Sequence, residues 1–164
     1  DKLAVHLFLM YWGMISFITP PVAIGAYAAA SVAKSNPLHT GLEAMRLGSI
    51  IYFVPFFFVL NPALIGHGTL PEIITVLTST VIGIGLLSAG LQGYLFWVGS
   101  LDRNAMGMVA RIGLVISGGL LAFPGSDITG YTHLELNGSA VVVFIIALGF
   151  AMKGRRPPEV DAPA

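Results

Sequence analysis

The residues best placed to do chemistry are Thr19, Pro20 and Pro21, which interrupt an apolar stretch that runs over residues 3–33. Proline has no backbone N–H, and its ring clashes with the carbonyl four residues earlier. The pair is therefore expected to release the carbonyls of Ser16 and Phe17 from a helical ladder. In lipid, such an interruption persists only where protein packs on it or where it faces a watery cavity or a bound ion.

A break of this kind suits ion and anion binding. The first half-helix would end in carbonyls that can face Na⁺, and the second would present its positive N-terminal end to a carboxylate. The hydroxyls of Ser16 and Thr19 add neutral oxygen donors, which hard cations prefer. A second interpretation stays open, in which the helix is merely kinked and the two hydroxyls only satisfy its backbone.

Composition indicates an all-α integral membrane protein. Hydrophobic residues make up 55% of the 164 residues and charged residues 10%, where a soluble domain has about 25% charged residues. The mean hydropathy is +0.85. A net charge of zero argues against nucleic-acid binding, and the absence of cysteine excludes disulfides and thiolate metal sites.

Five apolar stretches are long enough to cross a bilayer, and the first of them is discontinuous at Thr19-Pro20-Pro21. They cover residues 3–33, 47–65, 73–98, 105–123 and 134–152. Thr40 to Glu43 predicts a capping box at the start of the second helix. Gly85, Ala89 and Gly93 predict a small-residue packing stripe, and Pro55 predicts a kink.

Basic residues predict the orientation. Alternating crossings with Lys34 in the cytoplasm place seven of the eight Lys and Arg residues there, which leaves only Lys2 outside. The C-terminus is then cytoplasmic, and Arg111 is expected to snorkel from its helix to that interface. Three parts follow: residues 1–66 as a transporter core, 67–153 as a C-terminal extension of three helices, and 154–164 as a disordered cytoplasmic tail.

An enzyme is not expected. The four histidines lie on different segments, and Ser117 has no partner histidine at a matching depth. We predict no catalytic residues and no cofactor, apart from Na⁺ as a coupling ion. A noncatalytic membrane scaffold is the rival interpretation, above all for the last three helices.

The part of the chain from about Leu3 to Ile65 resembles a known family. The motif residues are His6-Leu7-Phe8, Tyr11, Gly13-Met14-Ile15-Ser16, Ile18-Thr19-Pro20-Pro21-Val22-Ala23, Asn36-Pro37, Gly41 to Gly48, Pro55-Phe56 and Asn61-Pro62-Ala63-Leu64. They look like the end of the large (M) membrane subunit of tripartite ATP-independent periplasmic (TRAP) transporters, most of all the fused permeases that work with TAXI-type receptors. Many family members carry glycine where this chain has Ala23. The chain begins with Asp1, and we interpret it as the C-terminal part of a longer permease.

The resemblance implies a secondary active, Na⁺-coupled importer of small organic anions in a bacterial or archaeal inner membrane, working by an elevator movement. It implies two inverted repeats, of which the first repeat and both re-entrant hairpins would lie outside this chain. The implied partners are a periplasmic TAXI-type solute-binding protein, the rest of the permease with its small-subunit-like helices, the lipid bilayer and the anion itself. The implied substrate- and ion-binding residues are Gly13, Ser16, Phe17, Thr19, Pro20, Pro21, Val22 and Ala23, with Ser16 and Thr19 as Na⁺ ligands.

Overall fold

The structure is a computed structural model that describes residues 1–96, 98–101, 104–123 and 132–153. Its helices are α1 (Lys2–Ile15), α2 (Ile24–Ala33), α3 (Pro37–Leu47), α4 (Val54–Leu60), α5 (Leu70–Gln92), α6 (Ala105–Ala122) and α7 (His133–Lys153). Two 3-10 turns, η1 (Ser49–Tyr52) and η2 (Pro62–Ile65), flank α4, and a two-stranded antiparallel hairpin, β1 (Tyr94–Leu95) and β2 (Gly99–Ser100), follows α5. The all-α membrane fold class is confirmed. The tail expected over residues 154–164 lies outside the described residues.

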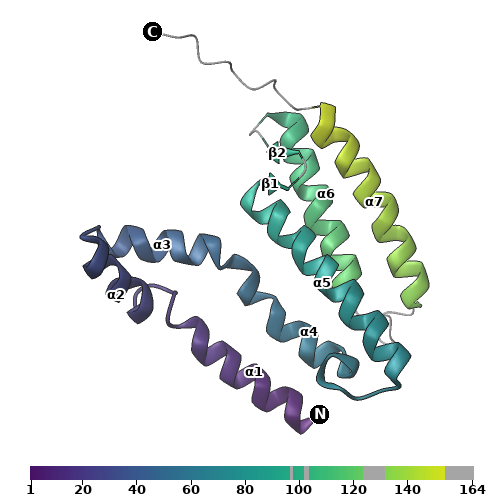
Figure 1. Cartoon of the computed structure of the whole chain (residues 1–164), viewed down its shortest axis with the longest axis horizontal. Helices are drawn as coiled ribbons and strands as arrows, with labels where there is room; N and C mark the ends of the chain where they lie inside the picture. The colour runs from purple at the N-terminus through teal and green to yellow at the C-terminus, as the bar shows by residue number, and fades with distance from the viewer. Residues whose placement is uncertain (97, 102–103, 124–131, 154–164) are drawn as a thin grey trace.

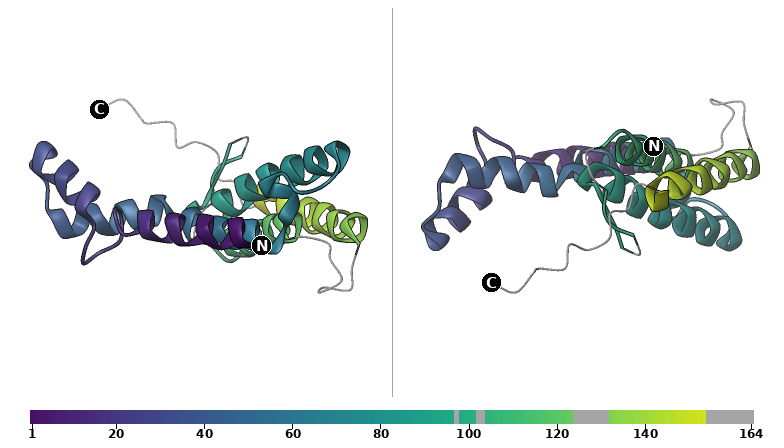
Figure 2. Two further views of the ribbon diagram at one scale, coloured as in Figure 1. Left: turned by 90° about the horizontal axis from the view of Figure 1, so that it is seen from below. Right: turned by 90° about the horizontal axis from the view of Figure 1, so that it is seen from above.

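The elements form two regions, which we call the arm (residues 1–66) and the bundle (α5 to α7). In the arm, α4 returns alongside α1, while α2 and α3 lie at the far end of the molecule (Figure 1). In the bundle, α5 packs on α6 and α6 on α7. Both views in Figure 2 show the arm reaching out beyond the bundle.

Aromatic side chains join the two long sides of the arm. The rings of Phe8 and Phe56 meet edge to face at a centroid distance of 5.3 Å, and those of Tyr11 and Phe58 do so at 5.5 Å. Edge-to-face pairs of this kind stabilise contacts by about 0.5 to 1.5 kcal/mol beyond area burial. These contacts join the middle of α1 to α4, whereas the break in the helix lies beyond the C-terminal end of α1.

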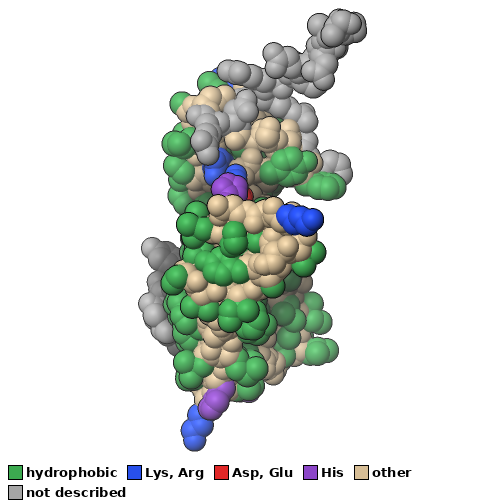
Figure 3. Space-filling model, turned by 90° about the vertical axis from the view of Figure 1, so that its left-hand side faces the viewer, with side chains coloured by type: hydrophobic (Ala, Val, Ile, Leu, Met, Phe, Trp, Pro, Cys, Tyr) green, Lys and Arg blue, Asp and Glu red, His purple; other side chains and the backbone are tan. Residues whose placement is uncertain are grey.

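Three helices are long and apolar enough to cross a membrane, namely α5, α6 and, within α7, Glu135–Lys153. A fourth span arises if α3 and the Ser49–Leu60 segment, bent by 66° at their junction, count as one. The described face in Figure 3 is covered mainly by hydrophobic side chains with few charges. The part of the chain that the structure describes is therefore built for a largely apolar surrounding.

Two local predictions in the arm need correction. The α3 helix begins at Pro37, not near Thr40, because the side chain of Asn36 caps it by accepting the backbone N–H of His39 at 3.2 Å. Asparagine before proline is itself a strong start signal, since proline at the first turn needs no hydrogen-bond partner. Pro55 likewise lies in the first turn of the short helix α4, and so does not kink a long one.

The packing stripe in the bundle also differs from the predicted one. A Cβ on Gly85 would meet nothing within 4 Å, and Gly93 ends α5 in a left-handed conformation with φ +72°. Glycines on another face make the contact: a Cβ on Gly83 would lie 2.7 Å from the carbonyl oxygen of Gly118, and one on Gly118 would lie 2.5 Å from that of Gly83. The buried residues of α5 follow this face, at Val76, Thr80, Gly83, Leu87 and Gly90.

Candidate functional site

The break predicted from the two prolines is present and is wider than they alone require. The α1 helix ends at Ile15 and α2 begins at Ile24. The last turn tightens, because the backbone N–H groups of Phe17 and Ile18 donate to carbonyls three residues earlier, at 3.1 Å each. Helix ends use such bonds to satisfy carbonyls that have lost their regular partners. The peptide bond between Pro20 and Pro21 is cis.

The expectation of two bare carbonyls is wrong for Phe17. Its carbonyl oxygen accepts the backbone N–H groups of Gly25 at 3.0 Å and Ala26 at 3.3 Å. The loop between α1 and α2 brings the unpaired N–H groups at the start of α2 onto that carbonyl. Two of the donors that would attract a carboxylate to this helix end are therefore already engaged in this arrangement.

Thr19 is the centre of a small hydrogen-bond network. Its hydroxyl donates to the carbonyl of Ile15 at 2.8 Å and lies 2.6 Å from the phenolic oxygen of Tyr52. A hydroxyl has one proton, so Tyr52 is the donor in the second bond. Ser16 behaves similarly, since its hydroxyl donates to the carbonyl of Gly13 at 2.6 Å. Both hydroxyls thus donate their hydrogen bonds to backbone carbonyls, and their oxygens can still accept hydrogen bonds or bind a cation.

Two glycines of the α3 region support the break from one side. A Cβ on Gly41 would lie 3.1 Å from the ring of Pro20 and 3.6 Å from the Cβ of Ala23. A Cβ on Gly48 would lie 2.7 Å from the Cδ1 of Ile18. The two glycines are seven residues apart, close to two helical turns, and this spacing is the signal that could have predicted the contact.

Ala23 occupies a conformation that favours glycine. Its φ is +33° and ψ is +40°, and its side chain is fully buried. The left-handed region is less favourable by about 1 to 2 kcal/mol for a residue that carries a Cβ. Glycine would adopt this conformation without that cost, and the surrounding contacts hold alanine there.

The predicted site residues do not all converge. Ser16, Thr19 and Pro20 are half-buried, and Ala23 is buried. Those that lie exposed are Gly13, Phe17, Pro21 and Val22. Tyr52 is the residue that sequence reasoning missed, because its contact with Thr19 spans 33 positions. Within the described residues, no three His, Asp or Glu side chains gather in a way that could hold a metal ion.

Fold and site together define a multi-pass α-helical membrane protein with a discontinuous helix at its N-terminal side. Residues 1–73 match the family model described as "Tripartite ATP-independent periplasmic transporter, DctM component". For that part of the chain the match supports the resemblance to TRAP transporter permeases. Searches of curated proteins and of solved structures found no match.

Proposed function

We propose that this chain is the permease portion of a secondary active, Na⁺-coupled importer of small organic anions, and that the break between α1 and α2 forms part of its binding site. The observation that carries the proposal is the position of the break. It lies inside the segment that matches the transporter family and contains two side-chain hydroxyls whose protons point to the backbone. Proteins place interrupted helices at membrane depth where they bind ions or substrates.

The chemistry of the donors suits an alkali cation. Ser16 and Thr19 offer neutral oxygens, as a hard cation prefers. The Thr19 hydroxyl donates to the Ile15 carbonyl and accepts from the Tyr52 hydroxyl, so its oxygen retains one further lone pair for a cation. Bound Na⁺ would add positive charge near the start of α2, and a substrate carboxylate would be attracted to both.

The partners follow from the family name. A permease of this family works with a periplasmic solute-binding protein and a small membrane subunit, and we propose a TAXI-type receptor and fused small-subunit-like helices for this chain. We place it in a bacterial or archaeal inner membrane with a cytoplasmic C-terminus. Contacts within the chain agree with the proposed pairing of loops, since Asp1 pairs with His67 at one end and Gln92 contacts Leu47, next to Arg46, at another. The excess of Lys and Arg on one side supports the cytoplasmic assignment. Reporter fusions after Lys153 test it.

The rival function is a membrane scaffold with a structural break. The Phe17 carbonyl and the Thr19 hydroxyl, which are engaged in the local fold, favour it. The two functions differ in one measurable respect. A binding site changes its affinity for Na⁺ when a ligand is removed, whereas a scaffold changes only in amount or stability.

The decisive experiment measures Na⁺-dependent uptake by the intact permease with its receptor. Thr19→Val removes the hydroxyl at nearly constant shape and should raise the Na⁺ concentration for half-maximal uptake by about 5- to 150-fold, corresponding to about 1 to 3 kcal/mol. Thr78→Val is the matched control, because its hydroxyl also donates to a carbonyl four residues earlier, at 2.7 Å, but on α5. An equal Na⁺ concentration for half-maximal uptake in wild type and Thr19→Val would contradict the binding site and favour the scaffold function.

Replacing Pro20 and Pro21 together by alanine is a second arm of the same experiment. Alanine restores two backbone N–H groups, so the helical ladder can close across the break. Uptake should then fall while the protein accumulates normally. Normal uptake by this variant would contradict a role for the break in transport.

A further inference from the structure

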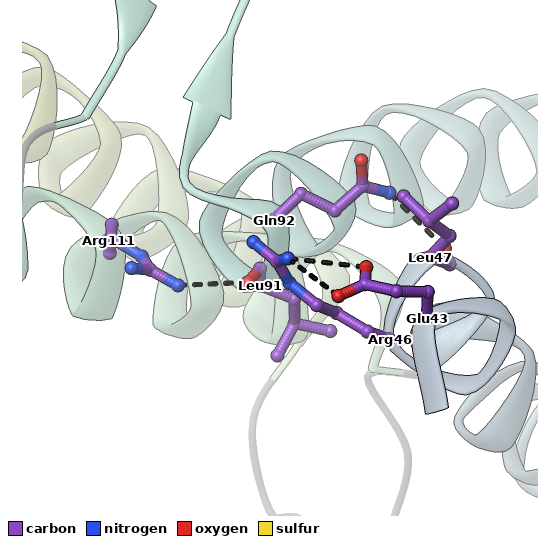
Figure 4. Close-up of polar contacts among 6 residues, drawn as sticks. All are labelled: Glu43, Arg46, Leu47, Leu91, Gln92 and Arg111. Atoms are coloured by element: carbon purple, nitrogen blue, oxygen red, sulfur yellow. Dashed lines mark hydrogen bonds and ion pairs between the residues drawn. The ribbon is translucent and has the colours of Figure 1, made fainter. Parts of the chain in front are cut away.

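Arg111 connects α6 to the C-terminal end of α5. Its Nε donates to the carbonyl of Gly90 at 3.1 Å. Its Nη2 donates to the carbonyl of Leu91 at 2.9 Å, as Figure 4 shows. A guanidinium at this place complements the negative end of the α5 dipole. The side chain therefore does more than reach toward an interface, as the sequence predicted, because it binds the neighbouring helix.

The guanidinium lies beside the C-terminal end of α5, one of the helices long and apolar enough to span a membrane. The carbonyls that it binds belong to the last residues of α5, and the hairpin follows at once, with Tyr94 exposed on β1. Tyrosine side chains gather at both membrane–water interfaces. The apolar course of α6 then continues from Arg111 into the span.

Arg111 keeps unused donor capacity and positive charge. A guanidinium has five N–H donors, and two of them serve the α5 carbonyls. Among the residues that the structure describes, no carboxylate pairs with it. Arg46, at the same end of the molecule, differs in this respect, because its Nη1 lies 3.3 Å from the Oε2 of Glu43.

An apolar groove of about 440 Å³ lies along α6 at this guanidinium, against the last turn of α5. Arg111 is its charged lining residue, and the others are Gly90, Leu91, Met108, Ile112, Val115 and Ile116. The side chains of Met108, Ile112 and Ile116 are about half exposed. The groove thus combines one cationic side chain with an apolar surface along α6.

We propose that this groove binds an anionic phospholipid, with its phosphate on the free N–H groups of Arg111 and an acyl chain along Ile112 and Ile116. Arginine binds phosphate through paired, charge-assisted hydrogen bonds. Basic pockets between transmembrane helices are known sites for anionic headgroups. The apolar lining favours a lipid over free phosphate, because phosphate alone would leave that surface unused.

Native mass spectrometry of the intact permease in detergent tests the proposal, with phosphatidylglycerol as the probe and phosphatidylcholine as the neutral comparison. We expect R111Q to retain at least about 10-fold less phosphatidylglycerol than wild type. R46Q is the matched control, because the same charge is removed from an arginine that already has a carboxylate partner. It should bind as wild type does, and millimolar inorganic phosphate should not displace the lipid.

I112W keeps the test valid if R111Q does not fold. Tryptophan would fill the groove while the guanidinium still binds the α5 carbonyls, so the variant should fold and lose the lipid. Wild-type retention by either folded variant would overturn the proposal, as would an equal loss in R46Q. Equal binding of phosphatidylcholine would contradict recognition of the anionic headgroup, and displacement by phosphate would indicate a free-anion site.

Discussion

The arm and the bundle are held together by different kinds of contact. In the bundle, α5 and α6 meet backbone to backbone, and the positions that a Cβ would take on Gly83 and Gly118 are already filled by main-chain atoms of the other helix. In the arm, Gly41 and Gly48 face side-chain atoms, and Tyr52 holds Thr19 by one hydroxyl bond. Main-chain contacts cannot yield without moving a helix, whereas side-chain contacts can rearrange locally.

This difference bears on the transport function proposed above. Such a function requires a fixed part against which a binding part can change conformation, and short, interrupted helices with few buried residues open at lower free energy than continuous packed ones. The bundle has the character of the fixed part and the arm that of the adjustable part. Three variants test the comparison.

Gly118→Ala should have the largest effect. Its Cβ would lie 2.5 Å from the Gly83 carbonyl oxygen and 2.6 Å from the backbone nitrogen of Leu87, so the helices must separate. We expect the free energy of unfolding to fall by about 1 to 3 kcal/mol. Thermal unfolding of the intact permease in detergent measures it. Gly85→Ala is the control, because a Cβ there meets nothing within 4 Å. Equal stability of the two variants would contradict a rigid backbone contact between α5 and α6.

Tyr52→Phe should have an intermediate effect. It removes the O–H that donates to Thr19 while keeping the ring, so stability should fall by about 0.5 to 1.5 kcal/mol. Tyr94→Phe, on the exposed hairpin residue, should leave the unfolding transition unchanged. If both variants unfolded like wild type, the hydroxyl bond would not hold the arm together, and the adjustable part would have to depend on its aromatic pairs.

Glu43→Gln should have the smallest effect. The ion pair between Glu43 and Arg46 is 3.3 Å long, but their side chains are 45% and 63% exposed, and solvent screens such pairs strongly. We expect a change within about 0.5 kcal/mol in the same unfolding experiment. A loss as large as that of Tyr52→Phe would mean that the charged surface of α3, and not the Thr19 network, stabilises the arm.

The sequence was most informative where one residue type dictates the local backbone. The proline pair predicted the break, because proline cannot donate to a helical ladder. The apolar runs predicted the ends of α5, α6 and α7 to within three residues, except that α5 ends at Gln92 and not near residue 98. Length and hydropathy suffice to define a span. Thr132 and Glu135 could also have predicted the start of α7, because each accepts the other's backbone N–H, at 2.9 and 3.3 Å.

The sequence could not predict which surfaces meet. The glycines at 83 and 85 look equally small in a list of residues, yet only Gly83 faces α6, because the rotation of a helix depends on all its contacts at once. The proline pair likewise does not predict which groups form hydrogen bonds with the backbone and side-chain oxygens at the break. The Phe17 carbonyl is satisfied by the start of α2 and the Thr19 hydroxyl by Tyr52.

What the sequence alone determined is the class of the protein and the place where its first helix stops, since hydropathy and proline geometry act locally. Tertiary structure decided that the break folds back on α2, that α3 supports it through two glycines, and that Arg111 binds the end of α5. One of these contacts, between Gly48 and Ile18, joins residues 30 positions apart. No local preference encodes such a distance, because it depends on how the whole chain buries its apolar surface and pairs its polar groups.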